Sequence, residues 1–168
     1  DKNKEVGPVM SHSLLRKHIF PHVGKGAPTI VVLLDNLRYD QWKTIEPFMN
    51  EQFKTEQESY FFSILPTATQ YSRNAIFAGM MPAEIEANFP DKWKNDSEEG
   101  GKNLFEDFFL EKQVERVFRK GIKWDYVKVT NVNHGKELND NILNYLNNDL
   151  TVIVYNFIDM LSHARTEM

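Results

Sequence analysis

Two short, uninterrupted apolar runs constrain the fold of this chain more than any other feature of its sequence. Residues 29–34 read TIVVLL, and residues 150–157 read LTVIVYNF. Both runs are rich in β-branched residues, and both are continuous instead of alternating between apolar and polar. That pattern is typical of strands that are covered on both faces, as in a parallel sheet. The chain is therefore predicted to be an α/β protein.

The remaining segments alternate between strand and helix patterns. Residues 124–129 alternate as a third strand, and the aromatic run at 59–64, SYFFSI, predicts a fourth that Pro66 ends. Apolar spacing predicts helices over residues 37–49, 70–79, 82–88, 104–118 and 136–146, with a turn at 131–135. A short helix is expected between Ser11 or Ser13 and Phe20. This alternation predicts a doubly wound, mostly parallel sheet.

Composition limits the function classes. The 168 residues suffice for one domain with a core, and the net charge of −4 offers no basic face for nucleic acid. The absence of cysteine excludes disulfides and thiolate metal sites. No apolar run reaches the roughly 18 residues of a membrane helix and no signal peptide opens the chain, so a cytoplasmic location is expected. Both ends are expected to be cuts within a longer polypeptide.

Polar residues follow the first apolar run directly. Asp35 comes next in the chain, followed by Asn36 and Arg38. In parallel sheets, ligand groups gather beyond the carboxyl ends of the strands, so Asp35 is a candidate site residue. Asn36 and Arg38 are candidate phosphate contacts. Two alternatives remain open, namely that Asp35 caps the helix that follows and that Arg38 is a structural ion-pair partner.

Two threonines precede the helix predicted from residue 70. Thr69 falls at the expected N-cap, where free N–H groups and the helix dipole favour an anion. Its hydroxyl is interpreted either as a helix cap or as a nucleophile that faces a phosphate. Thr67 is the less favoured nucleophile because it lies further from the helix start. Asn74, one turn beyond Thr69, is a candidate substrate contact.

Asp159 and His163 follow the last strand at a spacing of four residues. On a helix this spacing places both side chains on one face, and an oxygen with an imidazole suits a zinc-class cation. Three strand ends would then deliver Asp35, Thr69 and this pair to one edge of the sheet. Such a set suits two-metal phosphoryl transfer, with Asp35 and Thr69 on one cation and Asp159 and His163 on the other.

Three segments, VVLLDNLRYD, LPTATQYSRNAIFAGMMP and VIVYNFIDMLSHARTEM, together resemble a PglZ domain of the alkaline phosphatase superfamily. They resemble in particular the effector domain of PorX-type response regulators of Bacteroidetes. The resemblance covers residues 10–168. It implies that Asp35 and Thr69 share one zinc ion, that Asp159 and His163 bind a second, and that the intact protein is a phosphodiesterase or phosphatase.

The resemblance also implies how the polypeptide is organised. Residues 1–27 are expected to be a linker with a short helix, and residues 28–168 the N-terminal part of the domain. A receiver domain is expected upstream in the same polypeptide, with a regulatory link to type IX secretion or gliding. Superfamily members supply further zinc ligands from a later part of the chain, beyond Met168 here. We therefore expect this stretch alone to bind zinc weakly or not at all and to be inactive.

Two classes of function compete. One is the zinc-dependent enzyme, and the other is a non-catalytic signalling or protein-binding module on a hydrolase fold. Presence of Asp35, Thr69, Asp159 and His163 together favours the enzyme, and the lack of cysteine disfavours a sulfatase. The expected substrate is a phosphodiester, with a nucleotide as one alternative that would stack on Tyr71, Trp93 or Phe89. The assembly state stays open, with a homodimer as one alternative.

Overall fold

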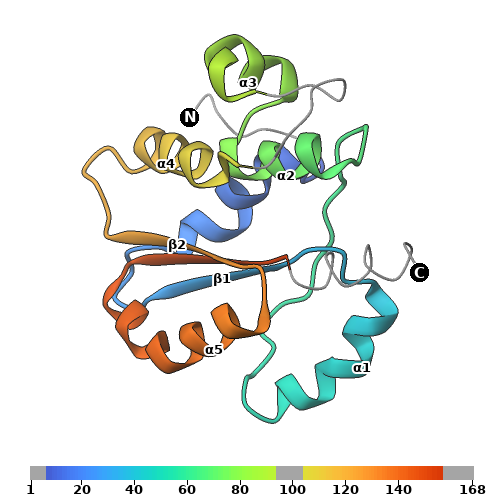
Figure 1. Cartoon of the computed structure of the whole chain (residues 1–168), viewed down its shortest axis with the longest axis vertical. Coiled ribbons are helices and arrows are strands. Elements are labelled where there is room, and N and C mark those ends of the chain that lie inside the picture. The colour runs from blue at the N-terminus through green and yellow to red at the C-terminus, as the bar shows by residue number, and fades with distance from the viewer. Residues whose placement is uncertain (1–6, 94–103, 157–168) are drawn as a thin grey trace. The chain divides into compact units, whose positions relative to one another are not determined.

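The computed structural model describes residues 7–93 and 104–156, and the chain divides into two compact units (Figure 1). The first unit comprises residues 1–22 and 59–121, and the second comprises residues 23–58 and 122–168. Each unit has its own set of helices or strands and its own packing. Within the described ranges, every helix is too short or too polar to cross a lipid bilayer.

A parallel three-stranded sheet forms the centre of the second unit. It consists of β1 (Thr29–Leu34), β2 (Trp124–Val129) and β3 (Leu150–Tyr155), in the order β1-β3-β2. The first five residues of β3 are buried, whereas Ile30 and Val32 of β1 are 38% and 52% exposed. The predicted α/β class with a parallel sheet is confirmed. The sequence predicts that both apolar strands are covered on both faces. This prediction is confirmed for the central strand β3 and is wrong for β1, which is an edge strand of the described sheet.

Two helices and a 3-10 turn complete the described part of the second unit. They are α1 (Tyr39–Asn50), α5 (Val132–Asn141) and the 3-10 segment Ile142–Asn147. Helix α5 connects β2 to β3 and runs along the sheet, where Leu138 lies in a buried cluster with Val129 and Ile153 (Figure 1). The turn expected at 131–135 is wrong. Asn131 caps α5 by accepting a hydrogen bond from the His134 N–H at 2.9 Å, so the helix already starts at Val132.

The first unit is mainly helical. It starts with short 3-10 and π-helical turns at Ser11–Ser13, Leu15–Ile19 and Phe20–His22, and continues with α2 (Thr69–Ala78), α3 (Pro82–Asn88), a 3-10 turn at Pro90–Lys92 and α4 (Glu106–Val117). Helices α2 and α4 lie side by side (Figure 1). The predicted helices at 82–88 and 104–118 are confirmed, the second within two residues at each end. The core includes the buried side chains of Ile64, Phe77, Ile85, Phe109 and Leu110.

The strand predicted at 59–64 is wrong. Phe62 forms a single parallel bridge with Met10, through hydrogen bonds of 2.8 Å to the Val9 carbonyl and 3.1 Å from the Ser11 N–H. Its partner segment turns into a 3-10 helix at Ser11, so the pairing cannot extend. Tyr60 and Phe62 are 75% and 67% exposed. Aromatic residues favour strands when they pack against side chains of a neighbouring strand, and a single bridge offers no such strand here.

Candidate active site

Thr69 is the first helical residue of α2, and Ala68 occupies the N-cap position. The prediction that Thr69 is the N-cap is therefore wrong by one residue. The N–H groups of Tyr71 and Ser72 both donate to the Ala68 carbonyl at 3.0 Å, which closes the first turn. No described side chain caps α2, so the N–H groups of Thr69 and Gln70, which precede these two, can bind an anion. Thr69 is half-buried, whereas Thr67 is exposed.

The opposite end of α2 is held by α4. Gly79 ends the helix in the left-handed conformation, with φ of 61°, and its N–H donates to the Ala75 carbonyl at 2.9 Å. The Gln113 amide nitrogen, in the orientation that satisfies its neighbours, donates to the carbonyls of Ile76 at 3.2 Å and Phe77 at 2.8 Å. Arg116 donates to the Ala78 carbonyl. Helix α4 thus satisfies the last carbonyls of α2 and anchors it.

A buried ion pair joins the middle of α2 to the start of α4. Arg73 Nε donates to Glu106 Oε1, and the two side chains are 4% and 1% exposed. Asn74, the next residue, is also buried, and so is Gln70. The contact between Arg73 and Glu106 ties the rotation of α2 to α4. Asn74 as a substrate contact stays a prediction, and the structure places it in the interior of the first unit.

In the second unit, Asp35 lies at the carboxyl edge of the sheet. Its N–H donates to the Tyr155 carbonyl at 3.1 Å, and the Asn156 N–H donates to the Val129 carbonyl at 2.9 Å. The ends of β1, β3 and β2 therefore meet, with half-buried Asp35 beside Asn156. Residues 59–64, which were expected to bring Thr69 to this edge, are not a strand of the described sheet, and a shared site of Asp35 and Thr69 stays a prediction.

Asn36 and Arg38 shape the turn from β1 into α1. Asn36 has φ of 60°, a left-handed conformation that asparagine tolerates better than most residues. Arg38 is the N-cap residue of α1, and its N–H donates to Gln41 Oε1 at 3.0 Å. The alternative in which Asp35 caps this helix is therefore wrong.

The Arg38 side chain forms a two-pronged ion pair with Asp40. Its Nε and Nη2 lie 2.9 Å and 2.6 Å from the two carboxylate oxygens. The hydrogen bonds from Arg38 lower the pKa of the Asp40 carboxyl from 3.8 to about 2. These contacts match the alternative in which Arg38 is an ion-pair partner. Its role as a phosphate contact stays a prediction.

Asp159 and His163, the predicted ligands of a second cation, lie outside the described residues. Among the residues that are described, no group of three or more histidine, aspartate or glutamate side chains is placed to hold a metal ion. The groups present do have the right chemistry for part of such a site. A half-buried carboxylate at the sheet edge and a half-buried hydroxyl at a helix start are both oxygen donors that a zinc-class cation accepts.

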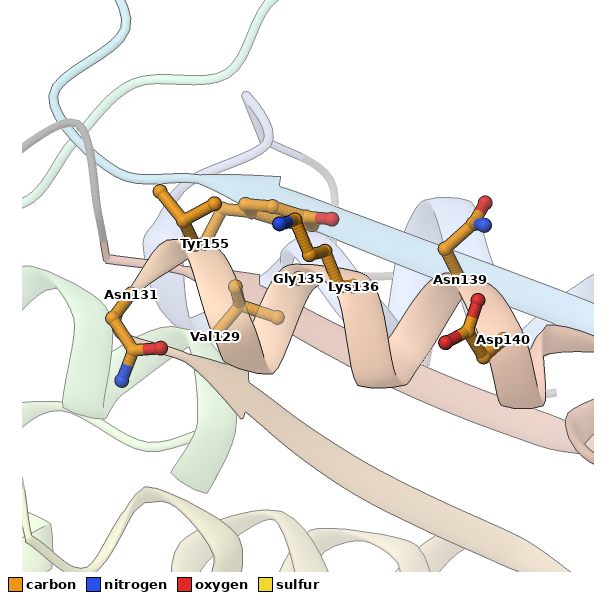
Figure 2. A pocket seen from close by; sticks show the side chains of 8 residues that line it. Val129, Asn131, Gly135, Lys136, Asn139, Asp140 and Tyr155 are labelled. Carbon is orange, nitrogen blue, oxygen red and sulfur yellow. The ribbon is translucent and has the colours of Figure 1, made fainter.

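A pocket of about 330 Å³ at the end of β2 was not anticipated from the sequence. It lies between α5 and the ends of β2 and β3, and Figure 2 shows Asn131, Lys136, Asn139 and Asp140 along its helical side. Residues 131–135 were interpreted as a surface turn. The signal that could have identified the pocket is the position of Asn131, which lies two residues after the end of β2, much as Asp35 lies directly after β1.

Comparison with known proteins connects these features to one family. The family model described as the BREX system PglZ alkaline phosphatase-like domain matches residues 14–168. The matched range contains Asp35, Thr69, Asp159 and His163. A search of curated proteins finds no match to the chain.

Proposed function

Because the chain belongs to the PglZ family of alkaline phosphatase-like domains, we propose that it supplies part of a zinc-dependent phosphodiesterase or phosphatase with Thr69 as nucleophile. The observation that carries this proposal is the start of α2. A half-buried threonine opens a helix of ten residues whose first N–H groups receive no side-chain cap among the described residues. A hydroxyl and an anion-binding helix start are thereby placed together.

The reaction that this arrangement suits has two steps. The Thr69 Oγ1 attacks phosphorus, an O–P bond forms, the bond to the leaving alcohol breaks, and that alcohol takes up a proton. Water then attacks the phosphothreonine, which releases phosphate or a phosphomonoester and restores the hydroxyl. The N–H groups at the start of α2 bind the phosphate oxygens, whose charge grows in the transition state.

Asp35 and Thr69 would hold one zinc ion, and Asp159 and His163 would hold the other. Zinc supplies Lewis acidity, which makes a bound hydroxyl or water easier to deprotonate near neutral pH. Support for Asp35 comes from its position at the carboxyl edge of a parallel sheet, where such sites are commonly built. Asp159 and His163 are proposed from the sequence alone.

The substrate class is a phosphodiester, with a nucleotide as the more specific proposal. Of the three rings considered as stacking platforms, Trp93 is only 6% exposed and lies 5.7 Å from the Tyr71 ring. Phe89 packs edge-on against Phe108 at 5.3 Å. This packing argues against Trp93 as a platform and favours Tyr71, which is half-buried in the first turn of α2.

The wider setting is proposed from the resemblance of the three sequence segments alone. The domain would be the effector of a cytoplasmic response regulator, with a receiver domain in the same polypeptide and a link to type IX secretion or gliding. Release of a product from a phosphodiester would then be the regulated output of a two-component system.

The test is a hydrolysis assay on the full-length polypeptide with a chromogenic phosphodiester and added zinc. Thr69→Ala should reduce turnover on the order of 10³-fold or more, because the attacking atom is lost. Thr67→Ala is the matched control, since it removes the same atoms from an exposed threonine two positions earlier, and it should change turnover little. Turnover that survives Thr69→Ala would contradict the assignment. Bound zinc without turnover in the wild type would favour the non-catalytic module.

A further inference from the structure

Three serine hydroxyls meet at the start of α2, and they come from segments far apart in the sequence. Ser72 Oγ lies 2.8 Å from Ser63 Oγ and 3.2 Å from Ser11 Oγ. The Ile64 N–H donates to Ser11 Oγ at 3.2 Å, and Ser63 Oγ donates to the Ile64 carbonyl at 3.3 Å. Ser11 is fully buried, and Ile64 is 1% exposed.

One arrangement of the hydroxyl hydrogens satisfies all four hydrogen bonds. Ile64 N–H donates to Ser11, Ser11 donates to Ser72, Ser72 donates to Ser63, and Ser63 donates to the Ile64 carbonyl. Each hydroxyl then donates once and accepts once, and the chain begins and ends on the same residue. Hydrogen bonds that are linked in this way polarise and strengthen one another. Ser72 is the member of this serine chain that belongs to α2.

Ser72 lies one helical turn from Thr69. Residues three apart are neighbours on a helix surface, so a contact that fixes Ser72 also fixes the rotation of the first turn. The Ser72 N–H donates to the Ala68 carbonyl at 3.0 Å, which ties Ser72 to the residue just before Thr69. The contacts from α4 begin further along α2, at Arg73, and they reach its last turn. The serine chain therefore ties the first turn of α2 to Ser11 and Ser63, in addition to the contact between the Tyr71 and Trp93 rings.

We propose that Ser72, held by Ser11 and Ser63, is a positioning residue that aims the Thr69 hydroxyl at phosphorus. The proposal rests on the proposed function of Thr69. Alanine at position 72 would keep the helix propensity and remove the middle of the serine chain. The first turn of α2 would then move more freely, while α4 would still hold the remainder of the helix. Displacement of a reacting group by about 1 Å can cost on the order of 10²-fold in rate.

The test compares Ser72→Ala with Ser13→Ala in the full-length polypeptide. Ser13 is a matched control, because it is also buried and, within the described part of the chain, its hydroxyl bonds to the N–H and carbonyl of Met10, at 3.0 Å and 3.1 Å. With a chromogenic phosphodiester and zinc, Ser72→Ala should lower kcat by about 10-fold to 100-fold and leave KM within about twofold. Ser13→Ala should change neither constant by more than about twofold. Ser72→Thr retains the hydroxyl and should restore most of kcat.

Amide hydrogen exchange supplies a readout that does not need turnover. In Ser72→Ala, the hydrogen-bonded amides of residues 71–73 should exchange about 10-fold faster than in the wild type or Ser13→Ala, while residues 74–78 keep their protection. Equal acceleration along all of α2 would overturn the positioning role, because it would indicate a general loss of structure. Ser72→Ala that matches Ser13→Ala in both kcat and exchange would also overturn it.

The outcomes separate this inference from the function on which it rests. Turnover lost in Thr69→Ala and unchanged in Ser72→Ala overturns the positioning role and leaves the proposed function standing. If the wild type shows no turnover, the proposed function is overturned, and so is the role of Ser72 in orienting the Thr69 hydroxyl for attack. The exchange rates then decide whether Ser72 holds the start of α2.

Discussion

The two units each contain an arginine–carboxylate pair, and the two pairs differ in burial. In the first unit, the side chains of Arg73 and Glu106 are 4% and 1% exposed. In the second, those of Arg38 and Asp40 are 68% and 66% exposed. In both pairs the guanidinium Nε donates to a carboxylate oxygen, so this shared contact does not distinguish them. Burial does distinguish them. A charge buried away from water is stabilised by its partner, whereas an exposed charge is already stabilised by water.

The same difference extends to polar contacts between segments that are far apart in the sequence of each unit. In the first unit, polar side chains join segments far apart in sequence, as Ser11 joins Ser72 and Arg116 joins the Ala78 carbonyl. In the second unit, the described ion pairs lie at the surface, such as Lys43 with Glu46 at 2.8 Å, and the packed cluster at its centre is apolar. The comparison suggests that buried polar contacts specify where α2 lies, whereas apolar packing is sufficient for the sheet.

The largest effect is expected from breaking the buried pair. Glu106→Ala in the full-length polypeptide should lower the free energy of unfolding by about 3–5 kcal/mol, because Arg73 stays buried without its carboxylate. Urea denaturation measures this, with Asp40→Ala as the matched control at the exposed pair. The double variant Arg73→Met with Glu106→Leu should regain most of the loss, since it leaves no buried charge. If the Glu106→Ala protein were as stable as the Asp40→Ala protein, the buried pair would contribute no more to stability than the exposed pair, and the comparison would fail.

A smaller effect is expected where α2 meets α4. Gly79→Ala should lower the free energy of unfolding by about 1–3 kcal/mol, from the left-handed backbone and from overpacking. Gly79 has φ of 61°, and an added Cβ would lie 2.7 Å from Gln113 Cδ.

Gly121→Ala is the control for the backbone part of this effect. Gly121 has φ of 74° and no atom within 4 Å of an added Cβ, so only the conformational cost applies. The difference between the two variants in urea denaturation measures how tightly α4 closes on α2. Equal losses would show that this contact tolerates an extra methyl group.

The smallest effect is expected at the exposed pair. The Asp40 carboxyl should titrate with a pKa of about 2, and Arg38→Gln should return it to near the ordinary value of 3.8. The lowered pKa means that the pair stabilises the fold above the ordinary pKa and loses this contribution as pH falls through about 2. An NMR titration of the carboxyl carbon measures both values. An ordinary pKa in the wild type would instead leave Arg38 free to contact phosphate.

Local patterns explain which predictions from the sequence succeeded. The bounds of β1, β2 and α3 agree with the predicted ranges, since apolar runs and proline or glycine positions mark them. The same apolar runs and proline or glycine positions also placed Asp35 after a strand and Thr69 at the start of a helix. The errors arose where a neighbour decided the outcome. Residues 59–64 pair with another segment through a single bridge, which is too short for a strand. The cap by Asn131 lets α5 begin within the range that was expected to be a turn.

The sequence by itself determined the α/β class, the parallel strands, the family, and the element ends at which Asp35 and Thr69 lie. Each of these follows from periodicity or motifs within a few neighbouring residues. Only the tertiary structure decided that Arg73 meets Glu106, 33 residues away, and that Ser72 meets Ser11, 61 residues away. Serine and arginine carry no local signal for a buried partner. Which polar groups meet is decided only when the helices pack together, because a polar group removed from water is costly unless it gains a hydrogen bond.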